Sequence, residues 1–163
     1  MFSIPPQILA QWKTPGATDF PRMGDTEFTA LETLWGFALP EDFKVFHRSI
    51  GAVTFFPESY CEFYYVLQRS SQSPVVHSAA IRSMTPFETL QLNHQYLIEN
   101  PDNDAGAPFF PPSMLPVGCD AGTNLILLGL GPHTPGVWFW EDNNDAFGHG
   151  SNVSLGFIAP TLQ

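Results

Sequence analysis

The residues best placed to do chemistry are two carboxylates at the end of a tryptophan-bearing segment. Glu141 and Asp142 directly follow the stretch that holds Trp138 and Trp140. A carboxylate beside tryptophan rings can bind a sugar, or can act as a general acid where burial raises its pKa. Residues two apart in a strand also point to the same face of a sheet, which would place both rings in an apolar core. We favour the core interpretation and keep a carbohydrate-directed site as the alternative.

No other pattern in the chain indicates an active site or a metal site. The G-x-S-x-G elbow of hydrolases does not occur. The five histidines include no pair at the i, i+2 or i, i+4 spacing of local metal ligands. Two acidic segments, residues 102–106 and 142–145, carry the first ligands of a calcium loop but lack its later ligands and its glycine at the required position. We therefore predict no catalytic residue, no metal and no cofactor, in a protein that is not an enzyme.

The chain is strongly acidic. It holds 16 Asp and Glu against 6 Lys and Arg in 163 residues, a formal net charge of −10 at pH 7 with His neutral. This charge disfavours binding to nucleic acid or to an anionic membrane surface, and it suits a basic protein partner or plain solubility. Two cysteines do not make the disulfide framework of a secreted domain, and the N-terminus lacks a basic and then apolar leader pattern. We expect a cytoplasmic protein.

Two short amphipathic helices are predicted near the start of the chain. The first has Asp25 as its N-cap, apolar residues at helical spacing, and Gly36 as its stop. In the second, Pro40 fits the first helical position and Gly51 fits a left-handed position after the C-terminus. The predicted buried stripe of the second helix is Phe43, Phe46 and Ile50.

The rest of the chain predicts one central helix among strands. Thr85-Pro86-Phe87-Glu88 has the form of a capping box with proline at the first helical position, and the helix that it opens ends before Pro101. Runs of β-branched and aromatic residues predict strands, and the short glycine-rich turns between the later ones indicate antiparallel neighbours. The predicted strands are residues 53–56, 60–67, 114–118, 125–130, 137–141 and 153–159.

The order of these elements is typical of the α+β class. We predict a single domain with an antiparallel sheet of about five to six strands, flanked by the N-terminal helices and the central helix. Residues 1–24 are rich in proline and predict an extended arm that lies on the domain. Residues 25–163 form the domain itself.

Two longer motifs stand far apart in the chain. The first runs from Phe28 to Gly51 and includes the helix start Leu39-Pro40-Glu41-Asp42-Phe43-Lys44. The second combines Leu115-Pro116-Val117-Gly118, an acidic glycine-rich turn, a strand, and the segment Val137–Asp142. Together they resemble the SUKH superfamily, which contains fungal cell-wall-assembly regulators and many bacterial immunity proteins. Members usually continue after the last strand into an amphipathic helix, of which residues 159–163 match only the first turn.

The resemblance implies a non-catalytic binding fold. It implies an immunity protein that binds a cognate toxin, such as a basic nuclease, and neutralises it by occluding its active site. The alternative within the superfamily is a scaffold that organises an endogenous pathway. The charge of −10 fits a basic partner independently of the resemblance. Acids in loops near aromatic anchors are the best partner-binding candidates: Glu58 with Tyr60, Asp102 and Asp104 with Phe109, and Glu141, Asp142 and Asp145 with Phe147.

Overall fold

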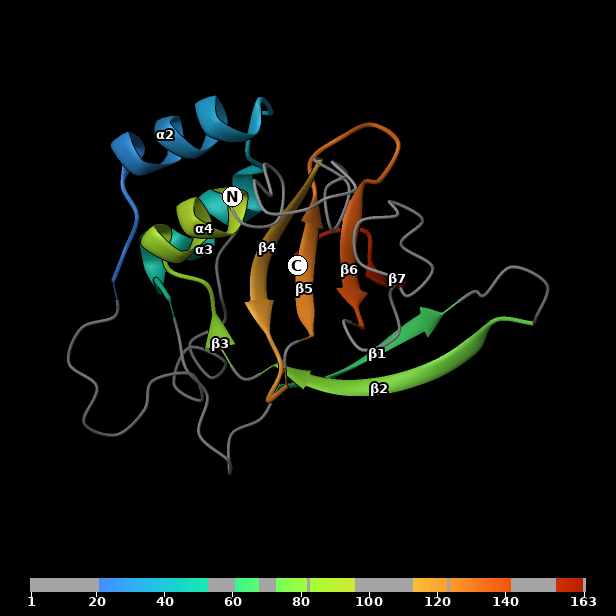
Figure 1. The fold of residues 1–163 in the computed structure, drawn as a ribbon. Coiled ribbons are helices and arrows are strands. Elements are labelled where there is room, and N and C mark those ends of the chain that lie inside the picture. Colours follow the sequence, from blue (N-terminus) through green and yellow to red (C-terminus); the bar gives the residue numbers. More distant parts are fainter. Residues whose placement is uncertain are drawn as a thin grey trace, which may run out of the picture.

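The computed structural model describes residues 21–52, 61–67, 73–81, 83–95, 113–122, 124–141 and 155–162. Within these ranges three helices gather at one side of a seven-stranded sheet (Figure 1). The strand order is β2-β1-β7-β6-β5-β4-β3, and every neighbouring pair is antiparallel. The predicted α+β class and the meander of later strands are confirmed, and the sheet has more strands than the five to six expected.

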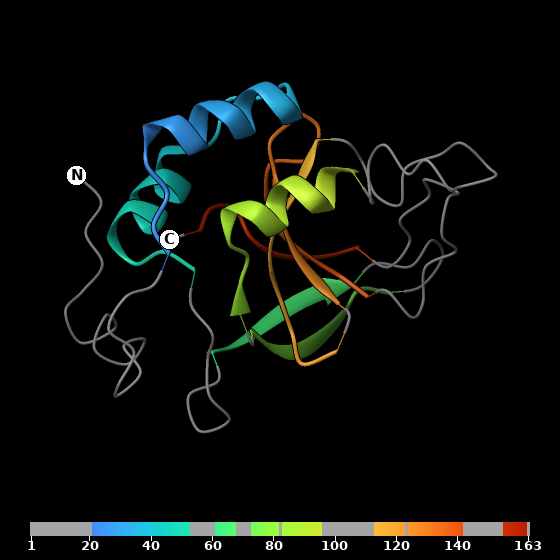
Figure 2. The same ribbon diagram turned by 60° about the vertical axis from the view of Figure 1, so that its left-hand side comes forward.

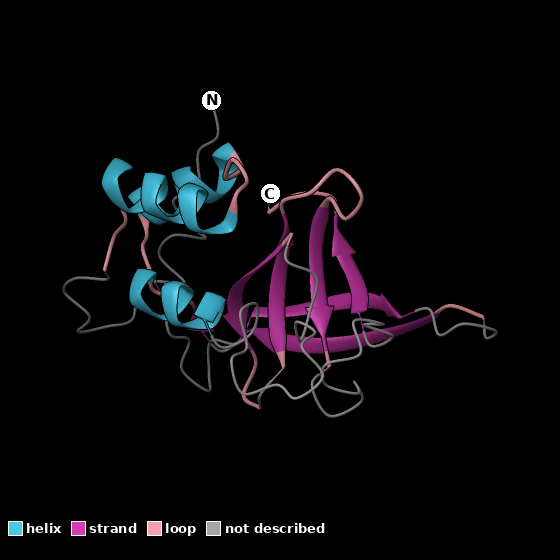
Figure 3. Cartoon of the chain, turned by 45° about the horizontal axis from the view of Figure 1, so that its top comes forward, coloured by secondary structure: helices cyan, strands magenta, loops and turns pink. Residues whose placement is uncertain are grey.

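The sheet curls, so that the β1–β2 hairpin crosses the later strands at a steep angle (Figure 3). The sequence did not predict β2 and β3. The middle of β2, Ser78-Ala79-Ala80, consists of weak strand formers, and β3 has only two residues. The predicted strand at residues 53–56 lies outside the described residues. The strands are β1 Cys61–Leu67, β2 Val75–Ile81, β3 Ser83–Met84, β4 Met114–Cys119, β5 Leu125–Gly129, β6 Gly136–Trp140 and β7 Leu155–Ala159.

Helix α2 spans Asp25–Trp35 and differs from the prediction at its N-terminus. The N-cap is Gly24, not Asp25, and the backbone N–H of Gly24 donates to Glu27 Oε2 at 2.9 Å. A carboxylate three residues into the helix therefore reaches back to the cap, which leaves Asp25 in the first turn, where its charge still suits the helix dipole. The predicted stop at Gly36 is confirmed by its left-handed φ of 73°.

Helix α3 spans Glu41–Ser49. Pro40 is its N-cap and not its first helical residue as predicted, so the helix begins one residue later than expected. The left-handed position at Gly51 is confirmed, with φ of 82°. Of the predicted stripe, Phe43 and Ile50 are buried and Phe46 is only half-buried. The sequence missed His47, which is fully buried on the same face.

Helix α4 spans Phe87–Asn93, and the predicted capping box before it does not form. Its N-cap is Pro86, with no side-chain hydrogen bond to the helix. Thr85 instead donates its backbone N–H to the carbonyl of Val117 in β4, at 2.9 Å. The residue predicted to cap the helix therefore extends the pairing between β3 and β4.

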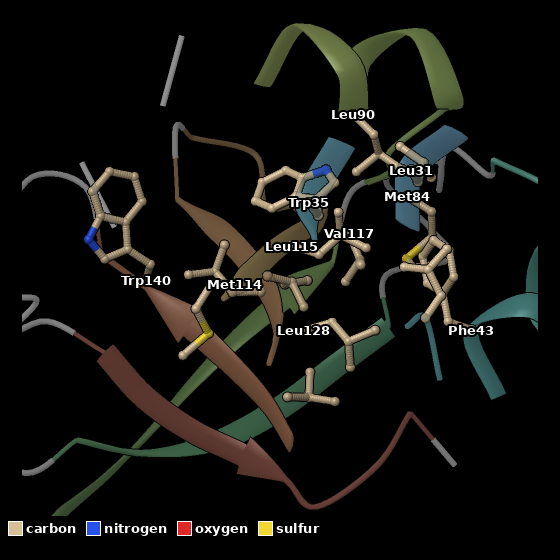
Figure 4. Close-up of a cluster of buried hydrophobic side chains, with 14 of the residues drawn as sticks. Leu31, Trp35, Phe43, Met84, Leu90, Met114, Leu115, Val117, Leu128 and Trp140 are labelled. Carbon is tan, nitrogen blue, oxygen red and sulfur yellow. The ribbon is translucent and has the colours of Figure 1, made fainter. Parts of the chain in front are cut away.

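One apolar core fills the space between the helices and the sheet (Figure 4). Helices α2 and α4 lie beside each other next to the sheet (Figure 2). Leu31, Trp35 and Leu90 reach from these two helices toward Leu115 and Val117 of β4. The other residues that are almost completely buried include Phe28, Phe43, Met114, Ile126, Leu127, Phe139 and Trp140.

Candidate partner-binding surface

Nine residues were predicted to contact a partner, and the structure describes one of them. Glu141 directly follows β6 and is half-buried. Its role as a partner contact stays a prediction. The other eight lie outside the described residues: Glu58, Tyr60, Asp102, Asp104, Phe109, Asp142, Asp145 and Phe147.

Glu141 is held by a tyrosine from a distant part of the sequence. The hydroxyl of Tyr65, in β1, donates a hydrogen bond to Glu141 Oε1. In the sheet, β7 lies between β1 and β6, so this hydrogen bond spans an intervening strand. The sheet thus presents Glu141 in a fixed position at the end of β6, where the acidic segment 142–145 begins.

A glycine in β7 makes this hydrogen bond possible. A Cβ added to Gly156 would lie 2.2 Å from the ring of Tyr65, which is far inside a van der Waals contact. The tyrosine ring also packs on Phe139, with centroids 4.7 Å apart, and stacks on the exposed His77 at 5.4 Å. The row His77, Tyr65 and Glu141 therefore runs from the edge strand β2 toward the end of β6.

The two tryptophans of β6 differ in their surroundings. Trp140 is 2% exposed and belongs to the core, as the core interpretation predicted. Trp138 is half-buried, packs edge-on against Phe157 with centroids 5.1 Å apart, and donates its indole N–H to the carbonyl of Pro135. Both rings are engaged in packing, which gives the carbohydrate-directed alternative no support from this strand.

The β1–β2 hairpin has an exposed apolar side, which we call the outer hairpin face. It comprises Tyr64 and Val66 of β1 with Val76 and Ser78 of β2, which lie directly opposite them in the register. The next pair on this side is Glu62 with Ala80, so one exposed carboxylate lies at the end of the face. Tyr64 is 68% exposed and Val76 is 65% exposed. The sequence did not reveal this face, because Glu62–Leu67 is almost uniformly apolar and shows no alternation to distinguish an inner side from an outer one.

The charged side chains of α2 and α3, which we call the helix layer, are by contrast paired within the fold. Lys44 Nζ lies 2.6 Å from Glu32 Oε1, and this hydrogen bond, together with one from the Leu39 N–H, holds the pKa of Glu32 below its usual value. Arg48 contacts Asp25 at 2.6 Å and Glu41 at 3.4 Å. These carboxylates are already paired with cations of the same chain. The acids of the helix pair are therefore weaker candidates for a partner contact than those after β6.

The described residues show few features of other kinds of site. No group of three potential metal ligands gathers within the described ranges. Among the described helices, none is long and apolar enough to cross a membrane. An open hollow of about 720 Å³ lies along α2, lined by Ala30, Thr33, Leu34 and Gln91 among others. Cys119 is a free, half-buried thiol that contacts the hydroxyl of Ser83 at 3.1 Å.

Residues 24–162 match the model of the SMI1 / KNR4 family (SUKH-1). The chain belongs to this family. The matched span of the SMI1 / KNR4 domain begins at Gly24, the N-cap of α2, and ends at Leu162, whose N–H donates to Asp42 Oδ2 of α3 at 3.0 Å. A comparison with curated proteins found no match.

Proposed function

We propose that this chain is an immunity protein that binds a cognate toxin and neutralises it by covering its active site. The observation that carries the proposal is the match to the SMI1 / KNR4 family (SUKH-1) over residues 24–162. Proteins of this family are generally non-catalytic immunity or regulatory proteins that act by binding other proteins. The chain performs no chemistry in this proposal and acts by occupying a surface of the toxin.

The charge of the chain supports a basic partner, such as a nuclease. A net charge of −10 raises the association rate with a basic protein and repels acidic ones. We place the contact at Glu141 and the acids that follow it in sequence, because the hydrogen bond from Tyr65 holds Glu141 at the end of a strand. A carboxylate in a fixed position loses little conformational entropy when it meets a cation of the partner.

The test is to look for a toxin-bearing reading frame next to the gene of this chain, and to co-express the C-terminal domain of that toxin with this protein. We expect cells to survive with this protein and to die without it, and equal killing in both cases would refute the proposal. Purified protein and toxin should bind more weakly as salt rises, because screening reduces the attraction between opposite charges.

A charge-reversal variant locates the contact. Asp142→Lys should weaken binding to the toxin by at least about tenfold, if the carboxylate pairs with a cation of the partner. Glu88→Lys is the matched control, because Glu88 is an exposed acid of α4, remote in sequence from the proposed contact. Equal effects of the two variants would show that the contact is not at the end of β6.

A further inference from the structure

Among the strands that the structure describes, β2 forms an open edge of the sheet. It is the terminal strand, and its residues Val75, Val76, His77 and Ser78 are all exposed, on both faces. Edge strands usually carry charged residues, proline or a bulge, because these prevent pairing with another chain. Residues 75–81 contain no charged residue and no proline, and they pair with β1 without a register shift. The opposite edge, β3, has only two residues and offers little to pair with.

The side chains next to this edge are apolar and exposed. The outer hairpin face places Tyr64 and Val66 beside Val76, with exposed fractions of 68%, 40% and 65%. A strand added beside β2 would extend this face and would cover part of these side chains. Val75, at the start of β2, is a further exposed apolar residue, at 49%.

The charge of the chain indicates which molecule supplies the added strand. A basic partner would be drawn to carboxylates, and β2 has none. A second copy of this chain carries −10 as well and is repelled by acidic surfaces, so a neutral strand is where two copies can approach at the smallest electrostatic cost. We infer that β2 is a self-association edge, on which two copies pair antiparallel through β2 about a two-fold axis.

We assign the register of such a pair by placing the two-fold axis at the middle of the strand, because this pairs all seven residues. An antiparallel pair of identical strands is isologous, and a two-fold axis at the middle of Val75–Ile81 places Ser78 opposite Ser78 of the other copy. Val76 of one copy then lies opposite Ala80 of the other and His77 lies opposite Ala79, so no two charged residues meet along the strand. The two hairpins join into one four-stranded sheet in which the two outer hairpin faces become continuous.

The size of the contact predicts a weak dimer. Seven residues of strand extend about 23 Å, and the strip that they cover with neighbouring side chains falls short of the roughly 800 Å² per partner of a standard stable interface. We therefore expect a monomer–dimer equilibrium at micromolar or higher concentration. Salt should strengthen it, because screening reduces the repulsion between two acidic chains. This is opposite to the salt dependence proposed for the toxin complex. An experiment can therefore refute one of the two associations without refuting the other.

The experiment is analytical ultracentrifugation of the full chain from about 1 μM to about 1 mM, at low and high salt. We expect a dimer that tightens with salt. Ser78→Asp places two carboxylates opposite each other at the axis and should weaken the dimer by at least about tenfold. Thr89→Asp adds the same charge to the exposed start of α4 and should leave the dimer unchanged.

A cross-link gives a positive signal at the same position. Under mild oxidation Ser78→Cys should form a disulfide-linked dimer, since directly opposite residues of antiparallel strands lie within disulfide reach. Thr89→Cys, which keeps the same native cysteines, should not. A chain that remains monomeric throughout, or a dimer that tolerates Ser78→Asp, overturns the inference. So does a monomer whose affinity for the toxin falls with Ser78→Asp, because the edge would then serve the toxin.

Discussion

The helix layer and the β1–β2 hairpin expose different kinds of side chain. In α2 and α3, the carboxylates of Asp25, Glu32 and Glu41 are each paired with a lysine or an arginine. On the outer hairpin face, Tyr64 and Val76 are about two-thirds exposed. The helix layer therefore exposes charge and buries aromatic rings, whereas the hairpin exposes apolar side chains along a neutral edge.

The contrast separates residues that stabilise the fold from residues available for binding. Paired charges and buried rings in the helix layer have their interactions satisfied within the domain. Exposed apolar side chains beside an open edge gain most of their stabilisation only when another chain covers them. The total charge of the chain does not make this distinction, because it counts the internally paired acids together with the others.

The largest expected effect compares one deletion of an aromatic ring in each region. Phe43 is fully buried, and its ring packs against those of Phe28 and His47 at 6.3 and 4.4 Å. Phe43→Ala should lower the free energy of unfolding by about 3–5 kcal/mol, because it removes buried contacts and leaves a cavity. Tyr64→Ala should change it by no more than about 0.5 kcal/mol. Urea unfolding of dilute protein measures both, and similar losses would mean that the hairpin face is part of the core.

The buried histidine gives the helix layer a pH dependence. Burial lowers the pKa of His47 from 6.5 to about 4, and neither ring nitrogen has a hydrogen-bond partner among the described residues. The unfolded chain therefore binds a proton between pH 6.5 and pH 4 that the folded chain does not. The stabilisation by neutral His47 is complete above pH 6.5 and is lost as the pH falls through 4, by about 3 kcal/mol in total.

Replacement of this histidine tests the assignment. Between pH 7 and pH 4, the free energy of unfolding should fall by about 3 kcal/mol more in the native chain than in His47→Leu. The comparison cancels the carboxylates, which both proteins share. His77→Leu, in the exposed part of β2, should retain the native pH dependence. If His47→Leu also kept it, another group would be responsible.

A smaller effect is expected where the hairpin meets the rest of the sheet. Gly156→Ala places a methyl group against the ring of Tyr65 and should displace it from Glu141. We expect a loss of about 1–3 kcal/mol in the free energy of unfolding, as for other overpacked sites. Gly122→Ala is the control, because a Cβ at this exposed turn would lie 3.4 Å from Asp120 Oδ1, an ordinary contact. Equal stability of Gly156→Ala and native protein would show that the ring has room to move.

The smallest effect concerns the ion pair between α2 and α3. Lys44 and Glu32 keep 20% and 28% of their side-chain surface exposed, so solvent screens their attraction. Lys44→Met should cost less than about 1 kcal/mol, and the difference from the native chain should shrink in high salt. Thermal or urea unfolding at two salt concentrations measures it. A larger loss that salt does not reduce would indicate that the stem of Lys44 contributes mainly by packing.

The sequence indicated the helix pair and the later strands because their signals are local. Pro40, Gly36 and Gly51 mark helix ends within a few residues of where they occur. The cap of α2 was misplaced by one residue, because Asp25 and Gly24 are both acceptable N-caps and only the geometry of Glu27 decides between them. The capping box predicted at Thr85 does not form, because the backbone N–H of Thr85 donates to the carbonyl of Val117 in β4.

The candidate site was less predictable than the fold. Glu141 could be named from its place beside an aromatic strand, yet nothing near it in the sequence points to Tyr65, 76 residues away. The strand at Val75–Ile81 was missed because it is exposed on both faces at its start and shows no alternation, and its middle residues, Ser78, Ala79 and Ala80, are weak strand formers. His47 was missed because a polar residue on an apolar helix face is not identifiable as core from spacing alone.

By itself, the sequence determined the α+β class, the two N-terminal helices, the acidic charge and the resemblance to SUKH proteins, because helix ends, periodicity and composition act over a few residues. Only the tertiary structure decided that β1 lies beside β7, that Tyr65 reaches Glu141 across Gly156, and that β2 is left as an open edge. These features depend on which distant strands pair and on which face of each is covered. That choice is made by the packing of the whole sheet, not by any single segment.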